Sequence, residues 1–127
     1  MRYFKLKEFL DSTEARKRGI ENTPTPEAIA NIELLVSNIL DPAREKFGSP
    51  IKINSGYRSA ELNKAVKGSD NSQHMRGQAA DITSKDNFRL FNLLKSLPFD
   101  QLIWERGGRW VHVSYNEGYN RRQIMWL

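Results

Sequence analysis

Apolar residues recur at spacings of three and four positions through the first half of the chain, a pattern typical of amphipathic helices. Residues 5–18 follow this pattern and predict a first helix that stops at Gly19. A longer helix is predicted from Pro26 onward, with Gly48 at its end. Since a proline inside a helix removes an N–H donor, Pro42 is expected to kink or divide it.

After Pro50 the pattern changes to short alternating or apolar runs, which are typical of strands. Strands are predicted at 51–54, 79–83, 101–105 and 110–114, and helices at 60–66 and 86–97. In the first of these helices, Leu62 and Val66 are expected to face the interior. Gly107-Gly108 predicts a hairpin turn between the last two strands. This order of elements predicts an α+β domain with a small, largely antiparallel sheet and N-terminal helices packed on it.

The composition narrows the possible classes of protein. A length of 127 residues suits one domain, so we expect residues 1–127 to form a single unit. The absence of cysteine excludes disulfides, thiolate metal ligands and a cysteine nucleophile. No apolar run approaches the roughly 20 residues that a membrane helix needs. The net charge of +5 comes without long runs of like charge, so we expect no nucleic-acid partner. The alternative that the charge leaves open is a basic nucleic-acid-binding domain, which would need clustered Lys and Arg.

The chain has only two histidines: Asp81 lies seven residues after His74, and His112 lies 31 residues after Asp81. His74, His112 and Asp81 together form a common ligand set of catalytic zinc, which leaves a fourth position open. Asp81 lies inside an otherwise apolar strand, where an unpaired carboxylate is costly, and a metal would satisfy it. Alternatively, the histidines are structural, and Asp81 caps a turn or pairs with an arginine.

Three sequence blocks, in the right order, resemble those of the M15 zinc peptidases. The stretch Ser72-Gln-His-Met-Arg-Gly-Gln-Ala-Ala-Asp81 resembles the family signature Ser-x-His-x-x-Gly-x-Ala-x-Asp. Ser55-Gly-Tyr-Arg58 and Trp110-Val-His-Val-Ser114 resemble the other two blocks. The resemblance covers about residues 51–115, and the N-terminal helices are similar to those of short M15A-like members found in phage and prophage genes.

The resemblance implies one zinc ion bound by His74, Asp81 and His112 in a fold of the hedgehog and D,D-peptidase type. It implies a zinc metallopeptidase, a D,D-carboxypeptidase or endopeptidase, that hydrolyses peptidoglycan stem peptides at or near D-amino acids. The alternative is a non-catalytic zinc-containing cell-wall-binding module of the same fold, as in the hedgehog relatives. We expect a monomer. The first residues do not form a signal-peptide pattern, so we expect cytoplasmic accumulation or phage-type release to the cell wall.

The general base departs from the family pattern. In much of the M15 family an acidic residue lies three positions before the last histidine, but here Arg109 occupies that position, and arginine cannot accept a proton. A turn centred on Gly107-Gly108 would put Glu105 on the same strand face as His112, in neighbouring cross-strand pairs. We therefore predict Glu105 as the general base. Alternatively, Glu105 only forms a salt bridge at the hairpin tip.

Two further residues are predicted to contact substrate. Arg58 matches the arginine of the first family block, which resembles a residue that polarises the scissile carbonyl or holds a substrate carboxylate. Its planar guanidinium suits both roles. Ser72, two positions before His74, is expected to hydrogen-bond the substrate backbone or to orient the histidine.

Overall fold

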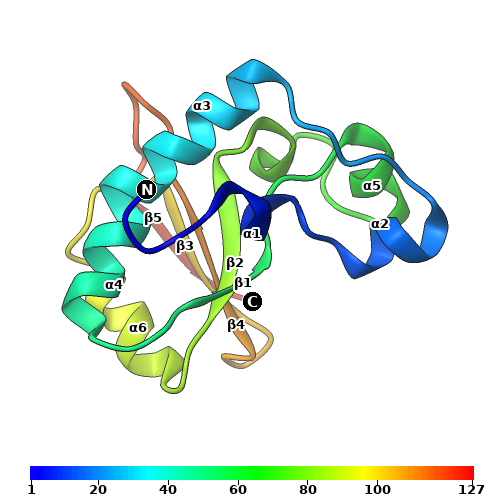
Figure 1. Ribbon diagram of the computed structural model, residues 1–127. Helices are drawn as coiled ribbons and strands as arrows, with labels where there is room; N and C mark the ends of the chain where they lie inside the picture. The colour runs from blue at the N-terminus through cyan, green and yellow to red at the C-terminus, as the bar shows by residue number, and fades with distance from the viewer.

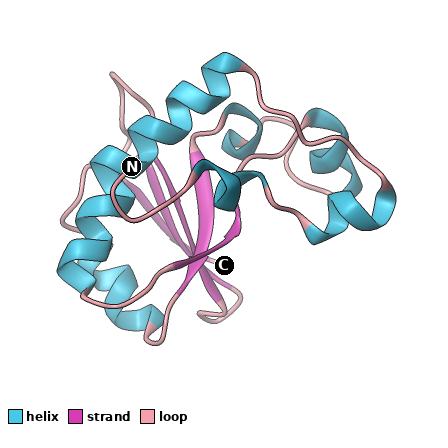
Figure 2. Cartoon of the chain, in the orientation of Figure 1, coloured by secondary structure: helices cyan, strands magenta, loops and turns pink.

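The computed structural model describes all 127 residues as a five-stranded sheet with one group of helices along one face and a second group of short helices on its other side (Figures 1 and 2). The strands are β1 (Lys52–Ser55), β2 (Ala79–Thr83), β3 (Gln101–Glu105), β4 (Trp110–Ser114) and β5 (Gln123–Trp126). Their order in the sheet is β1-β2-β4-β3-β5, and only the β3–β5 pair is parallel. The predicted small α+β fold is therefore confirmed.

The two faces of the sheet differ in chemistry because side chains alternate along each strand. Ile82, Leu102, Val111 and Val113 point to one face and join the hydrophobic core beneath the helices. The opposite face carries Asp81, Ile103, Glu105 and His112, together with other polar side chains at the sheet surface. The helical layer thus supports the sheet from behind and leaves its polar face available for a site.

The first predicted helix is two helices. α1 (Leu6–Leu10) ends at Asp11, and α2 (Thr13–Arg18) begins after Ser12, whose backbone is extended. The Ser12 hydroxyl accepts a hydrogen bond from the Ala15 N–H at 3.1 Å, so Ser12 starts a new helix instead of continuing the old one. The prediction of one helix over 5–18 was wrong because this capping residue interrupts an otherwise helical pattern.

The long helix bends through a π-helical turn without breaking. α3 (Pro26–Leu35) leads into η1 (Val36–Leu40), which leads into α4 (Asp41–Phe47). The Asp41 N–H donates to the carbonyl of Val36, five residues earlier. Pro42 has no N–H to donate, and the helix passes this position through the wider turn of η1. The inward side chains of η1 remain fully buried.

Three shorter helical segments complete the chain: α5 (Ala60–Ala65), the 3₁₀ turn η2 (Gln73–Arg76) and α6 (Asn87–Leu94). Leu62 is buried as predicted, but Val66 is 37 % exposed, because the helix ends before it. Asn63 takes the inner position instead. α6 ends at Leu94, earlier than predicted, and the chain then turns before Pro98. None of the helices is long and apolar enough to cross a membrane.

Gly77 joins the polar face of the sheet to the helical layer. It ends η2 in the left-handed region, at φ +74°, and a Cβ there would collide with the carbonyl group of Ala28 in α3. Gly19 also has a positive φ, of +66°, but has open space around it. Substituting each glycine by alanine therefore distinguishes the free-energy cost of a positive φ, present at both positions, from the cost of a steric collision, present only at Gly77.

We expect Gly77→Ala to lower the free energy of unfolding by about 2–4 kcal/mol, because it adds a steric collision to an unfavourable φ. Gly19→Ala carries only the conformational part and is expected to cost about 1 kcal/mol. Urea denaturation of the two variants measures the difference. Equal losses would show that the contact with α3 contributes nothing.

Candidate metal centre and cleft

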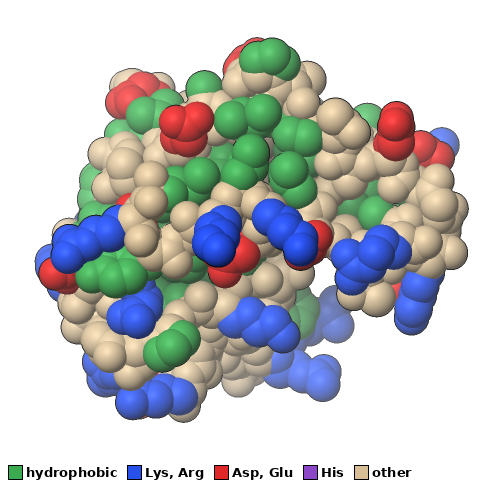
Figure 3. All heavy atoms as spheres, viewed as in Figure 1, with side chains coloured by type: hydrophobic (Ala, Val, Ile, Leu, Met, Phe, Trp, Pro, Cys, Tyr) green, Lys and Arg blue, Asp and Glu red, His purple; other side chains and the backbone are tan.

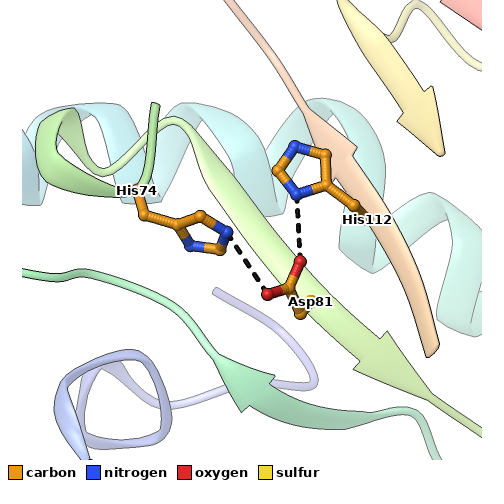
Figure 4. Close-up of side chains that lie close together, drawn as sticks. All are labelled: His74, Asp81 and His112. Atoms are coloured by element: carbon orange, nitrogen blue, oxygen red, sulfur yellow. Dashed lines mark hydrogen bonds and ion pairs between the residues drawn. The ribbon is translucent and has the colours of Figure 1, made fainter. Parts of the chain in front are cut away.

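The pairing of β2 with β4 brings the first two candidate ligands together. Asp81 and His112 are direct cross-strand partners in this antiparallel pair, and His74 approaches from η2 (Figure 4). His112 Nδ1 lies 2.9 Å from Asp81 Oδ1, and His74 Nε2 lies 3.4 Å from Asp81 Oδ2. The carboxylate thus lies between the two imidazoles, with one oxygen facing each ring.

The loop after β1 fixes the ring of His74. Its Nδ1 lies 2.7 Å from the carbonyl oxygen of Gly56, and this bond leaves Nε2 directed toward Asp81. The His74 N–H donates to the Ser72 hydroxyl, and the His74 carbonyl accepts from the Arg58 N–H at 3.0 Å. A ring nitrogen held by a carbonyl is a common way of orienting a metal-ligating histidine.

The protonation states favour metal binding. Burial lowers the pKa of His74, so its imidazole is neutral at pH 7 and has a lone pair to offer. Burial alone would raise the pKa of Asp81, but the two adjacent histidines hold it well below its usual range. A neutral imidazole and an ionised carboxylate are the forms in which these side chains bind a metal.

The donor set fits a single metal ion. One ligand atom from each of the three side chains can be chosen so that all lie within 4.8 Å of one another. All three side chains are largely buried, so little solvent competes for their lone pairs. Two imidazole nitrogens and one carboxylate oxygen form a three-ligand set that leaves room for a water or a substrate atom. The site can therefore hold a metal with an open coordination position.

Arg58 is the one cation in direct contact with this cluster. Its guanidinium donates to Ser55 Oγ at 3.3 Å and to Asn63 Oδ1 at 3.2 Å, and lies 3.5 Å from Asp81 Oδ2. Asp81 therefore pairs with an arginine as well as with the histidines. Since the Arg58 side chain is only 16 % exposed, its direction is fixed before any ligand arrives.

An open cleft of about 650 Å³ lies over the cluster. Its lining includes every side chain predicted for the site: Arg58, Ser72, His74, Asp81, Glu105 and His112. Arg109, at the position where the family pattern has an acid, is exposed and does not line the cleft. The arginine that replaces the family's acid is thus outside the cleft, while a glutamate lies within it.

The hairpin places Glu105 as its register predicts. Glu105 pairs with Trp110 and Ile103 with His112, so Glu105 and His112 share the cleft face. The turn spans four residues, Arg106 to Arg109, and an even number preserves the expected parity. No ion pair joins Glu105 to an arginine of this turn.

Sequence reasoning missed a second polar cluster at the other end of β3. Asp100 is fully buried, and Arg121 holds it through Nε at 3.0 Å and Nη2 at 2.9 Å. Gln73, next to His74, donates to the same carboxylate at 2.9 Å. Arg121 belongs to no sequence motif, and its partner Asp100 is distant in the chain, so only the tertiary fold reveals the pair.

Comparison with protein families agrees with this geometry. The family model for peptidase M15 matches residues 2–114, which is most of the chain. The chain therefore belongs to the peptidase M15 family, and its class is that of a peptidase with a site suited to a metal. Among curated proteins, none shows significant similarity to the chain. The match ends at the last residue of β4, so Arg121 and β5 lie beyond it.

The Asp100 cluster generates a pH-dependent stability. Burial favours a raised pKa for Asp100, but the hydrogen bonds from Arg121 and Gln73 outweigh it and lower the pKa. A carboxyl with a lower pKa in the folded state stabilises the protein above its unfolded pKa of about 3.9, and this contribution is lost as the pH falls. We expect Asp100→Asn to be less stable at neutral pH and to lose less stability on acidification.

Urea unfolding at about pH 7 and about pH 3 measures this difference. Asp70→Asn is the matched control, because Asp70 is exposed and forms no ion pair. An unchanged pH dependence in Asp100→Asn would contradict the role of the buried carboxylate.

Proposed function

We propose that this chain is a zinc-dependent metallopeptidase that hydrolyses stem peptides of bacterial peptidoglycan, at or near D-amino acids. One observation carries the proposal: a His–Asp–His cluster at the floor of an open cleft, with a free glutamate on the same sheet face. Membership in the peptidase M15 family supports hydrolysis of a peptide bond. The stem-peptide substrate rests on the resemblance to D-alanyl-D-alanine peptidases.

The proposed cofactor is one zinc ion held by His74, Asp81 and His112. Nitrogen and oxygen ligands in a set of three are typical of catalytic zinc. When bound, the ion acts as a Lewis acid that polarises the carbonyl and lowers the pKa of an attacking water. The protein supplies the rest of the chemistry through residues that line the cleft.

Glu105 is the proposed general base. It lies on the cleft face of β3, one residue pair away from His112, and diagonal neighbours of this kind are about 7–8 Å apart at the backbone. Its carboxylate would take the proton from the water as that water attacks the scissile carbonyl. It would then give the proton to the departing amine, so no proton is gained or lost by the protein.

Arg58 and Ser72 are proposed to hold the peptide. Since Asn63 and Ser55 fix the Arg58 guanidinium, its remaining donors are oriented for a carbonyl or a terminal carboxylate in the cleft. Ser72 Oγ accepts the His74 N–H, which makes orientation of the ligand its first role. Its hydroxyl proton remains free for the substrate backbone.

Positive charge of the molecule suits a cell-wall substrate better than a nucleic acid. On the face seen in Figure 3, Lys and Arg side chains are scattered, some beside acidic ones and several together in the lower half, without a continuous basic stripe. The excess of base, +5 overall, instead favours approach to an anionic wall. We propose that the protein reaches the wall by cell lysis or by phage-type release.

A cell-wall-binding module that holds zinc without hydrolysis is the second candidate. The observation that favours it is Arg109, which occupies the position of the acid in the resembling family pattern. The two candidates share the metal site and differ only in whether Glu105 acts as a base.

We expect the purified chain to bind one zinc ion and to become more stable by about 2.7 kcal/mol when free zinc is 100-fold above its Kd. Removing a residue that only hydrogen-bonds a metal ligand typically lowers the metal affinity by roughly 10–100-fold. His112→Ala removes a ligand itself and should lower the zinc affinity by more than that. Metal analysis and thermal unfolding with and without zinc measure both effects. Zinc-supplemented protein that holds no stoichiometric metal would contradict both candidates.

We expect Glu105→Gln to retain zinc and to lose hydrolysis by about 10²- to 10⁴-fold, because an amide cannot accept the proton. Glu21→Gln is the control, since Glu21 is exposed and does not line the cleft. Release of D-alanine or of cleaved stem peptide measures the rate. Near-normal turnover would remove Glu105 from its role, and a wild-type chain with zinc but no turnover would favour the binding module.

A further inference from the structure

The cleft continues past the metal site to the far end of β3. Arg121 lines this end, together with Arg76 from η2 and Gln101 at the start of β3. The segment after β4 folds back so that the backbone N–H of Arg121 donates to Asp100 at 2.8 Å. Since the family match stops at residue 114, this end of the cleft is built partly by a segment beyond the match.

Asp100 holds Arg121 in one orientation. The carboxylate engages Nε and Nη2 of the guanidinium, so Nη1 and the outer edge of Nη2 keep unused donors. The Arg121 side chain is 45 % exposed, whereas that of Asp100 is 1 % exposed. A ligand in the cleft therefore meets the cation and not the carboxylate behind it.

A shared frame of amides connects Arg121 with Arg76. Gln73 Nε2 donates to Asp100 and, at 3.3 Å, to Gln78 Oε1, and Arg76 Nε donates to the same oxygen at 3.2 Å. This orientation of Gln73 leaves its own Oε1 buried without a hydrogen-bond partner. Hydrogen bonds through Gln73 and Gln78 thus connect the two arginines, of which Arg76 is exposed at the surface.

The charge of the cleft lining is positive. Its cations are Arg58, Lys67, Arg76 and Arg121, against the carboxylates of Asp81 and Glu105, and a divalent ion at the ligands would add to the excess. Glu105 lies toward one end of β3 and Arg121 near the other. Negative charge on a ligand is therefore favoured at the Arg121 end and opposed near Glu105.

Strand geometry gives the spacing along the cleft. His112 is opposite Ile103, and Asp100 lies three residues before Ile103. At about 3.3 Å per residue this is roughly 10 Å, the length of two to three residues of an extended peptide. In the sheet order, Arg58 follows β1 on one side of the ligand strands and Arg121 adjoins β3 on the other.

We propose that Arg121, assisted by Arg76, forms an anion subsite that binds a carboxylate two to three residues from the scissile bond. The position of that bond rests on the proposed function. The ligand class is an acidic peptide, and the subsite selects a free carboxylate over the corresponding carboxamide. Arg58 and Arg121 lie on opposite sides of the metal ligands. If Arg58 holds the part of the peptide C-terminal to the scissile bond, the acidic residue at Arg121 is N-terminal to that bond.

Binding of matched peptides tests the subsite without requiring turnover. The probes are acetylated pentapeptides ending in D-Ala-D-Ala, with either glutamate or glutamine at the second or third residue before the terminal bond. Calorimetry on the zinc-loaded Glu105→Gln protein is expected to give about tenfold tighter binding for one of the glutamate peptides. Arg121→Gln in the same protein should abolish that preference by weakening the glutamate peptide only.

Arg109→Gln is the matched control, since it removes an equal charge from an exposed residue that does not line the cleft. It should leave the preference intact. Arg76→Gln, an exposed position that makes one side-chain bond, should reduce the preference and provides a test if Arg121→Gln does not fold. Equal affinity for glutamate and glutamine peptides, or an unchanged preference in both arginine variants, would overturn the subsite. Failure of the wild-type chain to hydrolyse any peptide would overturn the proposed function, while the affinity ratio would still decide the subsite.

Discussion

The antiparallel pairing of β2 with β4 is the constraint on which the site depends. It sets Asp81 directly opposite His112, so the two side chains meet without help from a loop. A shift of either strand by one residue would turn that strand's ligand to the other face, into the hydrophobic core, and would separate it from its partner. Because Ile82, Val111 and Val113 are buried on that core face, the packing that stabilises the sheet also fixes the register of the site.

The same alternation explains how much of the fold could be predicted from the sequence. The strands at 79–83, 101–105 and 110–114 agree with the prediction, since each has a well-defined pattern and clear turn residues at its ends. β5 was not predicted, because Ile124, Met125 and Trp126 follow one another without alternation. Its partner β3 is parallel and lies earlier in the chain, and no local signal announces such a pairing.

The candidate site was predictable where the residue types that can bind a metal are few in the chain. With no cysteine and two histidines, few ligand sets were possible, and the structure brings His74, Asp81 and His112 together. The position of Glu105 followed from the hairpin register. Arg121 was not predictable, since arginine is abundant here and its importance depends on Asp100, a contact formed only in the tertiary fold.

The contacts that orient His74 extend into the N-terminal segment. The carbonyl of Phe9 in α1 accepts the Tyr57 N–H at 2.7 Å, and Gly56, whose own carbonyl holds His74, packs so closely on Phe9 that any Cβ would collide with it. Docking of α1 and orientation of the histidine therefore form one cooperative unit. Local opening of the first helix would release the ring, so a bound metal would slow amide hydrogen exchange in a segment that provides no ligand to it.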